Sequence, residues 1–188
     1  MDIKATDVKA LRDKTGAGMM DCKNALVEAN GNMAEAEKIL KEKGLAAMAK
    51  RADRATAEGR IFVRNVENKI YVIELTCETD FVSNGADFVA LGEKLLDVTI
   101  EKGLTAVEQV HKDLLTEFTI KTRENMSVNS VNVYEIPENG VGSTYVHSDH
   151  KTGAVVLIKG SNADVVKQFA YDCCLHIAAF LPTYIKRE

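Results

Sequence analysis

An aromatic residue stands directly beside a carboxylate in the short run Thr79-Asp80-Phe81-Val82. This run joins a strand-like segment to a helix-like segment, where a loop would normally be polar. Burying Phe81 within its own chain requires no neighbouring carboxylate, so the pair indicates a loop that enters a partner. Packing of Phe81 beneath its own loop is the alternative that the residues leave open.

No catalytic centre is predicted from the nucleophilic and basic residues. Cys173 and Cys174 precede His176, so a Cys–His nucleophile pair can be imagined. A thiol on an apolar helical stripe is better explained as a small packed side chain. The sequence contains no P-loop and no G-x-G-x-x-G motif. We therefore expect a protein that makes and breaks no covalent bond, with a thiol enzyme as the alternative.

Metal and cofactor sites are not expected either. His147, Asp149 and His150 share one short turn, but three ligands so close together are a weak signal for a metal. The four cysteines form no C-x-x-C pair, which argues against zinc and against a disulfide framework. Free thiols are typical of a reducing compartment, so we expect the cytoplasm or, if a transit segment was removed, an organelle matrix.

Composition narrows the class of protein further. A chain of 188 residues with 46% hydrophobic and 28% charged residues fits one or two globular domains. The formal net charge is −4 and the isoelectric point is about 5.7, so the basic face of a nucleic-acid-binding protein is not expected. No apolar run is long enough to span a membrane, and Met1-Asp2-Ile3 leads straight into a helical pattern.

Three short helices are predicted in residues 1–45. Two glycines within Thr15–Gly18 end the first helix. Asn32 is expected to cap the third helix, with Glu35 completing a capping-box-like pair. So small a unit buries little surface and is expected to be a recognition module. The predicted helices are Thr6–Lys14, Met19–Ala29 and a third that follows Asn32 and ends at Gly44.

Met19 and Met20 directly follow the glycine turn. We place Met19 on the apolar stripe of the second helix, with Cys22, Leu26 and Ala29. At least one of the two methionines must then point away from that stripe, where a flexible thioether makes an adaptable apolar contact. Burial of both in a very small core is the alternative.

A linker is predicted after the helices, over residues 51–59. The stretch from Lys50 to Gly59 is charged and alanine-rich. A solvated charge run explains Lys50, Arg51 and Arg54 more simply than a basic contact patch does.

The pattern changes to strands after the linker. Apolar residues from Ile61 to Val66 and the alternation from Tyr71 to Cys77 predict a β-hairpin that turns at Glu67-Asn68-Lys69. The elements expected next are a helix through Phe88 and Leu96, a helix capped by Thr105 with Glu108, and a strand through Val128, Val131 and Val133.

The hairpin-and-helix unit recurs later in the chain. Gly142–Ile158 matches Gly59–Leu75, and a second helix with Phe169, Cys173 and Phe180 on its apolar stripe follows. The strand-to-helix loop of this second copy is shorter, so the segment that carries Phe81 is an insertion that the shared unit does not need. The second copy also lacks a completing strand before Glu188. We expect another chain to cover this sheet edge, or the native chain to continue.

Two long runs resemble the signatures of translation elongation factor Ts: Val8–Leu26, which contains T-G-A-G-M-M-D-C-K-N-A-L, and Cys77–Val82. The resemblance continues through Val141–His147 and Pro182–Lys186 and covers essentially the whole chain. It implies an α+β fold with a three-helix ubiquitin-associated-like domain at 1–50 and a linker at 51–59. Two pseudo-repeated α+β subdomains follow, at 60–140 and 141–188, with antiparallel strands packed on helices. The second is expected to be incomplete, because longer members insert a helical hairpin there and then complete its sheet.

The resemblance also implies a function, that of the guanine nucleotide exchange factor for the GTPase elongation factor Tu. In the family, the loop that matches Thr79–Val82 inserts beside the nucleotide and helps to dislodge Mg²⁺. The residues that match further partner contacts are Lys9, Arg12, Met19, Met20 and His147. No cofactor, no membrane contact and no direct nucleic-acid contact are implied, and homodimerisation stays open. A ubiquitin-binding adaptor remains the alternative, although it leaves the repeat and the Asp80-Phe81 loop unexplained.

Overall fold

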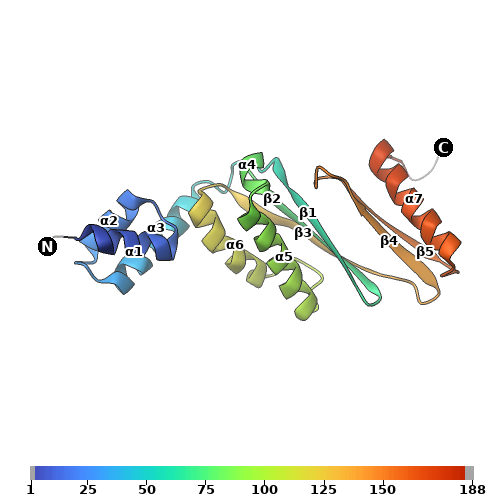
Figure 1. The fold of residues 1–188 in the computed structure, drawn as a ribbon, viewed down its shortest axis with the longest axis horizontal. Helices are drawn as coiled ribbons and strands as arrows, with labels where there is room; N and C mark the ends of the chain where they lie inside the picture. Colours follow the sequence, from blue (N-terminus) through green and yellow to red (C-terminus); the bar gives the residue numbers. More distant parts are fainter. Residues whose placement is uncertain (1–2, 185–188) are drawn as a thin grey trace.

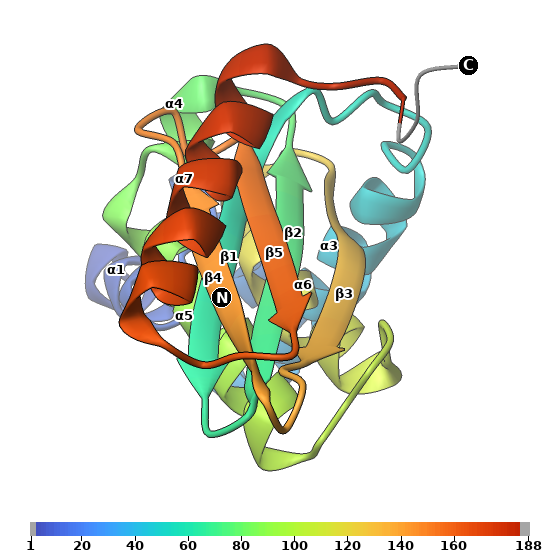
Figure 2. The ribbon, with the colours of Figure 1, turned by 90° about the vertical axis from the view of Figure 1, so that its right-hand side faces the viewer.

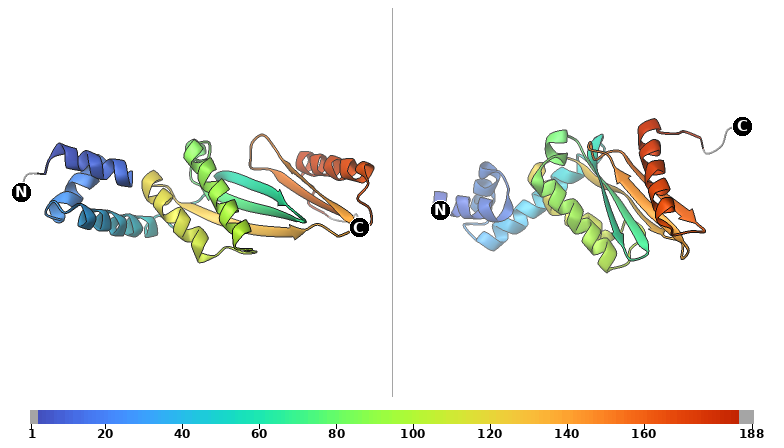
Figure 3. Two further views of the ribbon diagram at one scale, coloured as in Figure 1. Left: turned by 60° about the horizontal axis from the view of Figure 1, so that its bottom comes forward. Right: turned by 45° about the vertical axis from the view of Figure 1, so that its right-hand side comes forward.

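The computed structural model describes residues 3–184 as an elongated molecule (Figure 1). A three-helix unit lies at one end, a three-stranded sheet with its helices lies in the middle, and a two-stranded sheet with one long helix lies at the other end (Figures 1 and 3). The α+β class predicted from the sequence is confirmed. None of the helices in the described part of the chain is long and apolar enough to cross a membrane. Predictions that involve Met1-Asp2 or Ile185–Glu188 lie outside the described residues.

The N-terminal unit consists of α1 (Ala5–Thr15), α2 (Met19–Glu28) and α3 (Met33–Ala49). Their apolar faces meet in a small core around Leu11, Leu26 and Leu40. Asn32 caps α3, because its side-chain oxygen accepts a hydrogen bond from the Glu35 backbone N–H at 3.1 Å. The predicted cap and the first two predicted helices are therefore confirmed.

The third helix is longer than predicted. It continues through Gly44 to Ala49, so the prediction that Gly44 ends it is wrong. A Cβ atom at Gly44 would lie 2.8 Å from side-chain atoms of Ile120, which belongs to α6 (Gln109–Thr122). The glycine therefore allows α3 to approach α6 closely and does not terminate the helix.

The middle unit is built on the predicted hairpin. Strands β1 (Glu58–Val66) and β2 (Lys69–Cys77) pair antiparallel, and β3 (Met126–Glu135) pairs antiparallel with the other side of β2. Helix α5 (Ala86–Glu101) and α6 cover one face of this sheet (Figure 1). Their shared core is lined by fully buried side chains, among them Ile73, Leu75, Phe88 and Leu95.

Helix α6 begins later than predicted. Its N-cap is Glu108, so the prediction that Thr105 caps this helix is wrong. The Glu108 side chain accepts from the backbone N–H of His111, and His111 Nδ1 accepts from the Glu108 backbone N–H at 2.9 Å. A histidine thus completes a capping box in which Glu or Gln is the usual partner.

The second copy of the unit contains β4 (Gly140–Val146), β5 (Gly153–Lys159) and α7 (Asp164–Phe180). The two strands pair antiparallel, and α7 lies on one face of the hairpin while the other face is turned toward β1 and β2 (Figure 2). Hairpin followed by helix therefore occurs twice, as the internal repeat predicted. Within residues 3–184 the second sheet has only these two strands.

The face of α7 that packs on the hairpin differs from the prediction. Ala170 and Cys174 are its fully buried residues, whereas Phe169 is 61% exposed and Phe180 is 75% exposed. The predicted inward stripe is therefore wrong at both aromatic residues. The small side chains of the buried face allow the helix to lie close to the strands.

Candidate partner-binding surface

The run that begins at Thr79 forms a single helical turn, α4 (Asp80–Ser83), between β2 and α5. Thr79 caps this turn, because its hydroxyl oxygen accepts from the backbone N–H of Val82 at 3.4 Å. At the other end, the backbone N–H of Asn84 donates to the Asp80 carbonyl at 2.9 Å. The segment that the second copy lacks is therefore a hydrogen-bonded turn and not an irregular loop.

The turn buries some side chains and presents others. Val82 is half-buried against the core of the middle unit, and Ser83 is only 2% exposed. Phe81, in contrast, is 87% exposed. The alternative that Phe81 packs beneath its own loop is wrong, because Val82 and Ser83 occupy that place. Asp80 is also exposed, and among the described residues its carboxylate makes no hydrogen bond or ion pair.

A carboxylate from a distant element holds the beginning of the turn. Glu124 Oε2 accepts from the backbone N–H groups of Glu78 and Thr79 at 3.1 and 3.0 Å. Its Oε1 accepts from the Thr79 hydroxyl at 2.5 Å. Glu124 is 45 residues from Thr79 in the sequence, and no local pattern marks it.

A guanidinium holds the end of the same turn. Arg60 of β1 donates from Nε to the Ser83 carbonyl at 2.7 Å and from Nη2 to Asn84 Oδ1 at 2.8 Å. The turn is thus fixed at both ends by charged side chains from other elements. The sequence analysis predicted neither Arg60 nor Glu124, because each contacts the turn across a long separation in the sequence.

The turn between β4 and β5 lies beside α4 (Figure 2). It carries His147, whose exposed ring places Nδ1 2.9 Å from the Tyr145 hydroxyl. The His150 carbonyl accepts from the Ile61 backbone N–H at 2.7 Å, which ties this turn to β1. Lys151 forms an ion pair with Glu58 at the start of β1. The structure therefore brings His147 and the Asp80-Phe81 turn to the same end of the two sheets.

The histidine-rich turn offers no metal site in the structure. Asp149 accepts from the backbone N–H groups of Lys151 and Thr152 at 2.9 and 3.1 Å. These hydrogen bonds to the charged form lower the pKa of the Asp149 carboxyl. Its carboxylate is thus used to fold its own turn, and residues 3–184 contain no group of three His, Cys, Asp or Glu side chains that could hold a metal.

The remaining predicted contact residues lie on the N-terminal unit. Lys9 and Arg12 are exposed on α1, and Met19 and Met20 are 47% and 65% exposed at the start of α2. The prediction that Met19 belongs to the buried stripe is wrong, since the buried residues of α2 are Cys22, Ala25 and Leu26. The predicted residues therefore form two groups, one on α1 and α2 and the other around α4 and the β4–β5 turn.

The thiols of Cys22, Cys77 and Cys174 are buried, and Cys173 is partly buried. Cys77 ends β2, where burial raises the pKa of its thiol to about 11 and the nearby Glu124 charge adds to the shift. Its Sγ donates to the Thr79 carbonyl at 3.2 Å. Burial also raises the pKa of the Cys174 thiol. A thiol with a raised pKa is a poor nucleophile, which disfavours the thiol-enzyme alternative.

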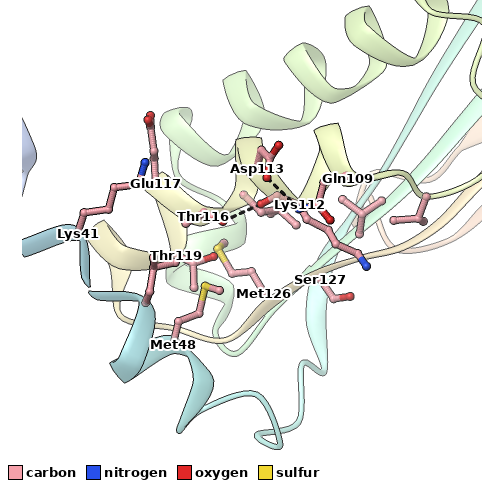
Figure 4. A pocket seen from close by; sticks show the side chains of 14 residues that line it. Lys41, Met48, Gln109, Lys112, Asp113, Thr116, Glu117, Thr119, Met126 and Ser127 are labelled. Carbon is pink, nitrogen blue, oxygen red and sulfur yellow. Dashed lines mark hydrogen bonds between the residues drawn. The ribbon is translucent and has the colours of Figure 1, made fainter. Parts of the chain in front are cut away.

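A groove of about 920 Å³ lies between α3, α6 and the start of β3 (Figure 4). Met48 and Met126 line it, with Lys41 and Glu117 at its side (Figure 4). None of the predicted contact residues lines this groove. The exposed side chains on the turns and helix ends, and not this concavity, are the candidate site.

Fold and site together define an α+β protein that repeats a hairpin-and-helix unit, adds a three-helix unit in front of it, and presents an aromatic residue on an inserted turn. Residues 78–188 match the family model described as Elongation factor TS. The chain is 48% identical over 193 residues to elongation factor Ts of Treponema denticola, an alignment that covers 100% of this chain and 69% of the relative. It is 46% identical to elongation factor Ts of Treponema pallidum, with 100% and 70% covered. For Nautilia profundicola elongation factor Ts the identity is 37%, with 100% and 66% covered. The chain therefore belongs to the elongation factor Ts family of translation elongation factors.

Proposed function

We propose that this chain is the guanine nucleotide exchange factor for the GTPase elongation factor Tu, and that the α4 turn enters the GTPase beside its nucleotide. The observation that carries the proposal is the side chain of Phe81, which is 87% exposed on a turn capped at both ends. An aromatic side chain held in water without a local contact is suited to burial in a partner. We propose the cytoplasm as its compartment, since the relatives that the chain resembles are bacterial elongation factors.

Exchange requires no covalent step, only differential binding. The factor must bind the nucleotide-free GTPase more tightly than the nucleotide-bound GTPase. By linkage, nucleotide and factor then weaken each other's binding by the same factor, at about 1.4 kcal/mol for each tenfold. Every contact that the factor makes only with the nucleotide-free form therefore lowers the affinity of the GTPase for nucleotide.

Phe81 can supply a large part of this difference. Burying an aromatic side chain that is exposed in the free protein stabilises a complex by about 2–3 kcal/mol. If Phe81 is buried only when the nucleotide site is distorted, that energy holds the distorted form. If Phe81 acts as such a wedge, the difference corresponds to about 30- to 150-fold in nucleotide affinity.

Asp80 brings a negative charge to the same place. Mg²⁺ joins protein groups to phosphate oxygens in GTPases, so a disturbance of its ligands weakens the hold on the nucleotide. The Asp80 carboxylate makes no hydrogen bond or ion pair among the described residues, so it is available to act on the partner. We assign to it electrostatic competition near Mg²⁺ rather than a role in shaping the loop.

The two groups of exposed residues suggest docking at two places. Lys9, Arg12, Met19 and Met20 would anchor the N-terminal unit on the GTPase through mixed apolar and charged contacts. His147 would contact the partner close to the α4 turn. We propose 1–50 as the docking domain, 51–59 as its linker, 60–140 as the subdomain that carries the α4 turn, and 141–188 as the second subdomain, which carries His147.

Release of fluorescently labelled GDP from elongation factor Tu, chased with unlabelled GDP, tests the proposal. We expect the wild-type chain to accelerate release, and Phe81→Ala to lower the rate at saturating factor by about 30- to 150-fold. Phe180→Ala is the matched control, since it removes another exposed phenylalanine, 75% accessible on α7, and should leave the rate unchanged. If Phe81→Ala at saturating concentration released GDP as fast as wild type, the proposal that Phe81 acts as a wedge would be overturned.

Binding to ubiquitin separates this proposal from the adaptor alternative. An adaptor should bind ubiquitin through the N-terminal unit and leave GDP release from the GTPase unchanged. An exchange factor should bind nucleotide-free elongation factor Tu and lose that binding when GDP and Mg²⁺ are added. Titration calorimetry with each protein distinguishes the two outcomes.

A further inference from the structure

We propose that Arg123-Glu124-Asn125 is a joint that positions the α4 turn, with Glu124 as the positioning residue that keeps Phe81 in place. The inference rests on the proposed function, because it concerns how the same turn is presented to the GTPase. It assigns a role to residues that lie outside both groups of predicted contacts.

The α4 turn cannot hold its own shape. Asp80–Ser83 is a single turn, and one isolated helical turn is unstable in water because nucleation is costly. The two residues that lead into the turn, Glu78 and the cap Thr79, are instead held from outside it. One Glu124 oxygen accepts from their backbone N–H groups at 3.1 and 3.0 Å, and the other accepts from the Thr79 hydroxyl at 2.5 Å. Hydrogen bonds to a carboxylate are stronger than those between neutral groups.

The Thr79 side chain links this carboxylate to the exposed residues. Its hydroxyl donates to Glu124 and at the same time accepts from the Val82 N–H at 3.4 Å. Glu124 therefore fixes the rotamer of the cap, and the cap fixes the backbone on both sides of Phe81. Arg60 closes the other end at the Ser83 carbonyl.

The two neighbours of Glu124 contact two further segments. The Asn125 backbone N–H donates to Glu78 Oε1 at 2.6 Å, and its side-chain amide donates to the carbonyls of Ala52 and Arg54 at 3.1 and 2.7 Å. Arg123 pairs with Asp21, the residue after Met20, at 2.5 Å. Three consecutive residues thus contact the beginning of the α4 turn, the linker, and the start of α2, where Met19 and Met20 lie.

The backbone of the joint explains how three neighbours reach three directions. Arg123 ends α6 in the left-handed conformation, with φ at 62°. This conformation is strained for a residue with a side chain and persists where surrounding contacts hold it. The reversal turns the chain out of α6 so that Glu124 faces Thr79 while Arg123 faces α2. The joint therefore contacts both the α4 turn and the N-terminal helices, and so links their relative positions.

Glu124→Gln tests the joint with little change in size. The amide removes the charge and replaces one acceptor oxygen by a donor. With the amide oxygen on the two N–H groups, its NH2 faces the Thr79 hydroxyl, which loses the acceptor that it donates to. Glu138→Gln is the matched control, because Glu138 is exposed in the turn between β3 and β4, its side chain makes no hydrogen bond or ion pair among the described residues, and it loses the same charge. We expect Glu124→Gln to lower the maximal GDP-release rate by about tenfold or more, since small misplacements are costly. The factor concentration at half-maximal rate and the Glu138→Gln rates should stay near wild type.

A double-mutant cycle shows whether Glu124 acts through Phe81. In the Phe81→Ala background, Glu124→Gln should lower the rate little further, because the group that it positions is gone. An equal loss in both backgrounds would mean that Glu124 acts elsewhere and would overturn the inference. Glu124→Asp, which keeps the charge but shortens the reach, should fall between wild type and Glu124→Gln and serves if the Gln variant folds poorly.

Amide hydrogen exchange tests the joint without the GTPase. Glu124→Gln should speed exchange at residues 80–84 while α5, α6 and the central strands keep wild-type protection. Unchanged exchange at 80–84 would overturn the inference whatever the release rates show. If the wild-type chain fails to accelerate GDP release, the proposed function fails, whereas this measurement still reports on the joint.

Discussion

His111 is a neutral imidazole by the geometry of its hydrogen bonds. Its Nδ1 accepts from the Glu108 backbone N–H at 2.9 Å, so that nitrogen carries no proton. The Thr99 hydroxyl donates to the Leu95 carbonyl at 2.6 Å, so its oxygen accepts from His111 Nε2–H at 2.9 Å. The side chain is fully buried, and this burial lowers the pKa of His111 below 6.5. A proton on Nδ1 would face a backbone donor and break the cap of α6.

This histidine predicts that the fold is sensitive to acid. Its pKa is lower in the folded chain, so the unfolded chain binds more protons as the pH falls below about 6.5. The free energy of unfolding should therefore fall from about pH 7 to about pH 5. His111→Gln retains a capping acceptor and does not titrate, so it should be less stable at pH 7 but should show a smaller fall. Urea unfolding of both proteins at the two pH values measures the difference. Equal pH dependence would contradict the assignment.

At the scale of elements, the packing of α5 on the sheet depends on one missing side chain. A Cβ atom at Gly92 would lie 2.0 Å from the ring of Phe62 on β1. Phe62 is only 6% exposed, so its ring has little room to move. The glycine therefore sets the distance between this helix and the strands that precede α4.

Gly92→Ala should lower the free energy of unfolding by about 1–3 kcal/mol, the usual cost of overpacking a core. This loss should appear although alanine favours the helical conformation by about 1 kcal/mol. Phe62→Leu in the same chain should restore part of the stability, because it frees the space that the new methyl group needs. Chemical denaturation of the single and double variants provides the measurement. If Gly92→Ala were more stable than wild type, the helix propensity of alanine would outweigh the steric overlap of its methyl group with Phe62.

The whole molecule depends on how the N-terminal unit is attached. The Asp21–Arg123 ion pair is exposed, with side chains 53% and 62% accessible, and such pairs contribute little energy. The packing of Gly44 against Ile120 brings α3 close to α6 and adds apolar contact. Packing rather than the ion pair thus holds the unit in place.

Gly44→Leu should force α3 away from α6 without unfolding either unit. We expect a larger radius of gyration by small-angle X-ray scattering. We also expect a higher factor concentration for half-maximal GDP release, because the N-terminal unit and the α4 turn can no longer contact the GTPase together. Ile120→Ala in the Gly44→Leu background makes room and should reverse part of both effects. Scattering identical to that of wild type would contradict this expectation, because it would show that α3 keeps its position without the close contact between Gly44 and Ile120.

The sequence by itself determined the elements and the repeat. Apolar periodicity, the Asn32 cap, and the alternation of β2 were sufficient to predict helices and hairpins, because these signals are local. Comparison of the two copies also identified the Phe81 segment as an insertion. Signature runs then indicated the family, which the 48% identity to a curated relative supports.

Only the tertiary structure decided which side chains face which neighbours. Periodicity gives the spacing of an apolar stripe but not its direction, so Met19 and Phe169 were assigned to the interior although both are exposed. Gly44 was assigned as a helix stop because its neighbour Ile120 is distant in sequence. The hydrogen bonds between Glu124 and Thr79 join residues that are 45 positions apart in the sequence, and no local pattern predicts such a pairing. The exposure of Phe81 was open for the same reason: whether a loop residue is buried depends on what other segments leave uncovered.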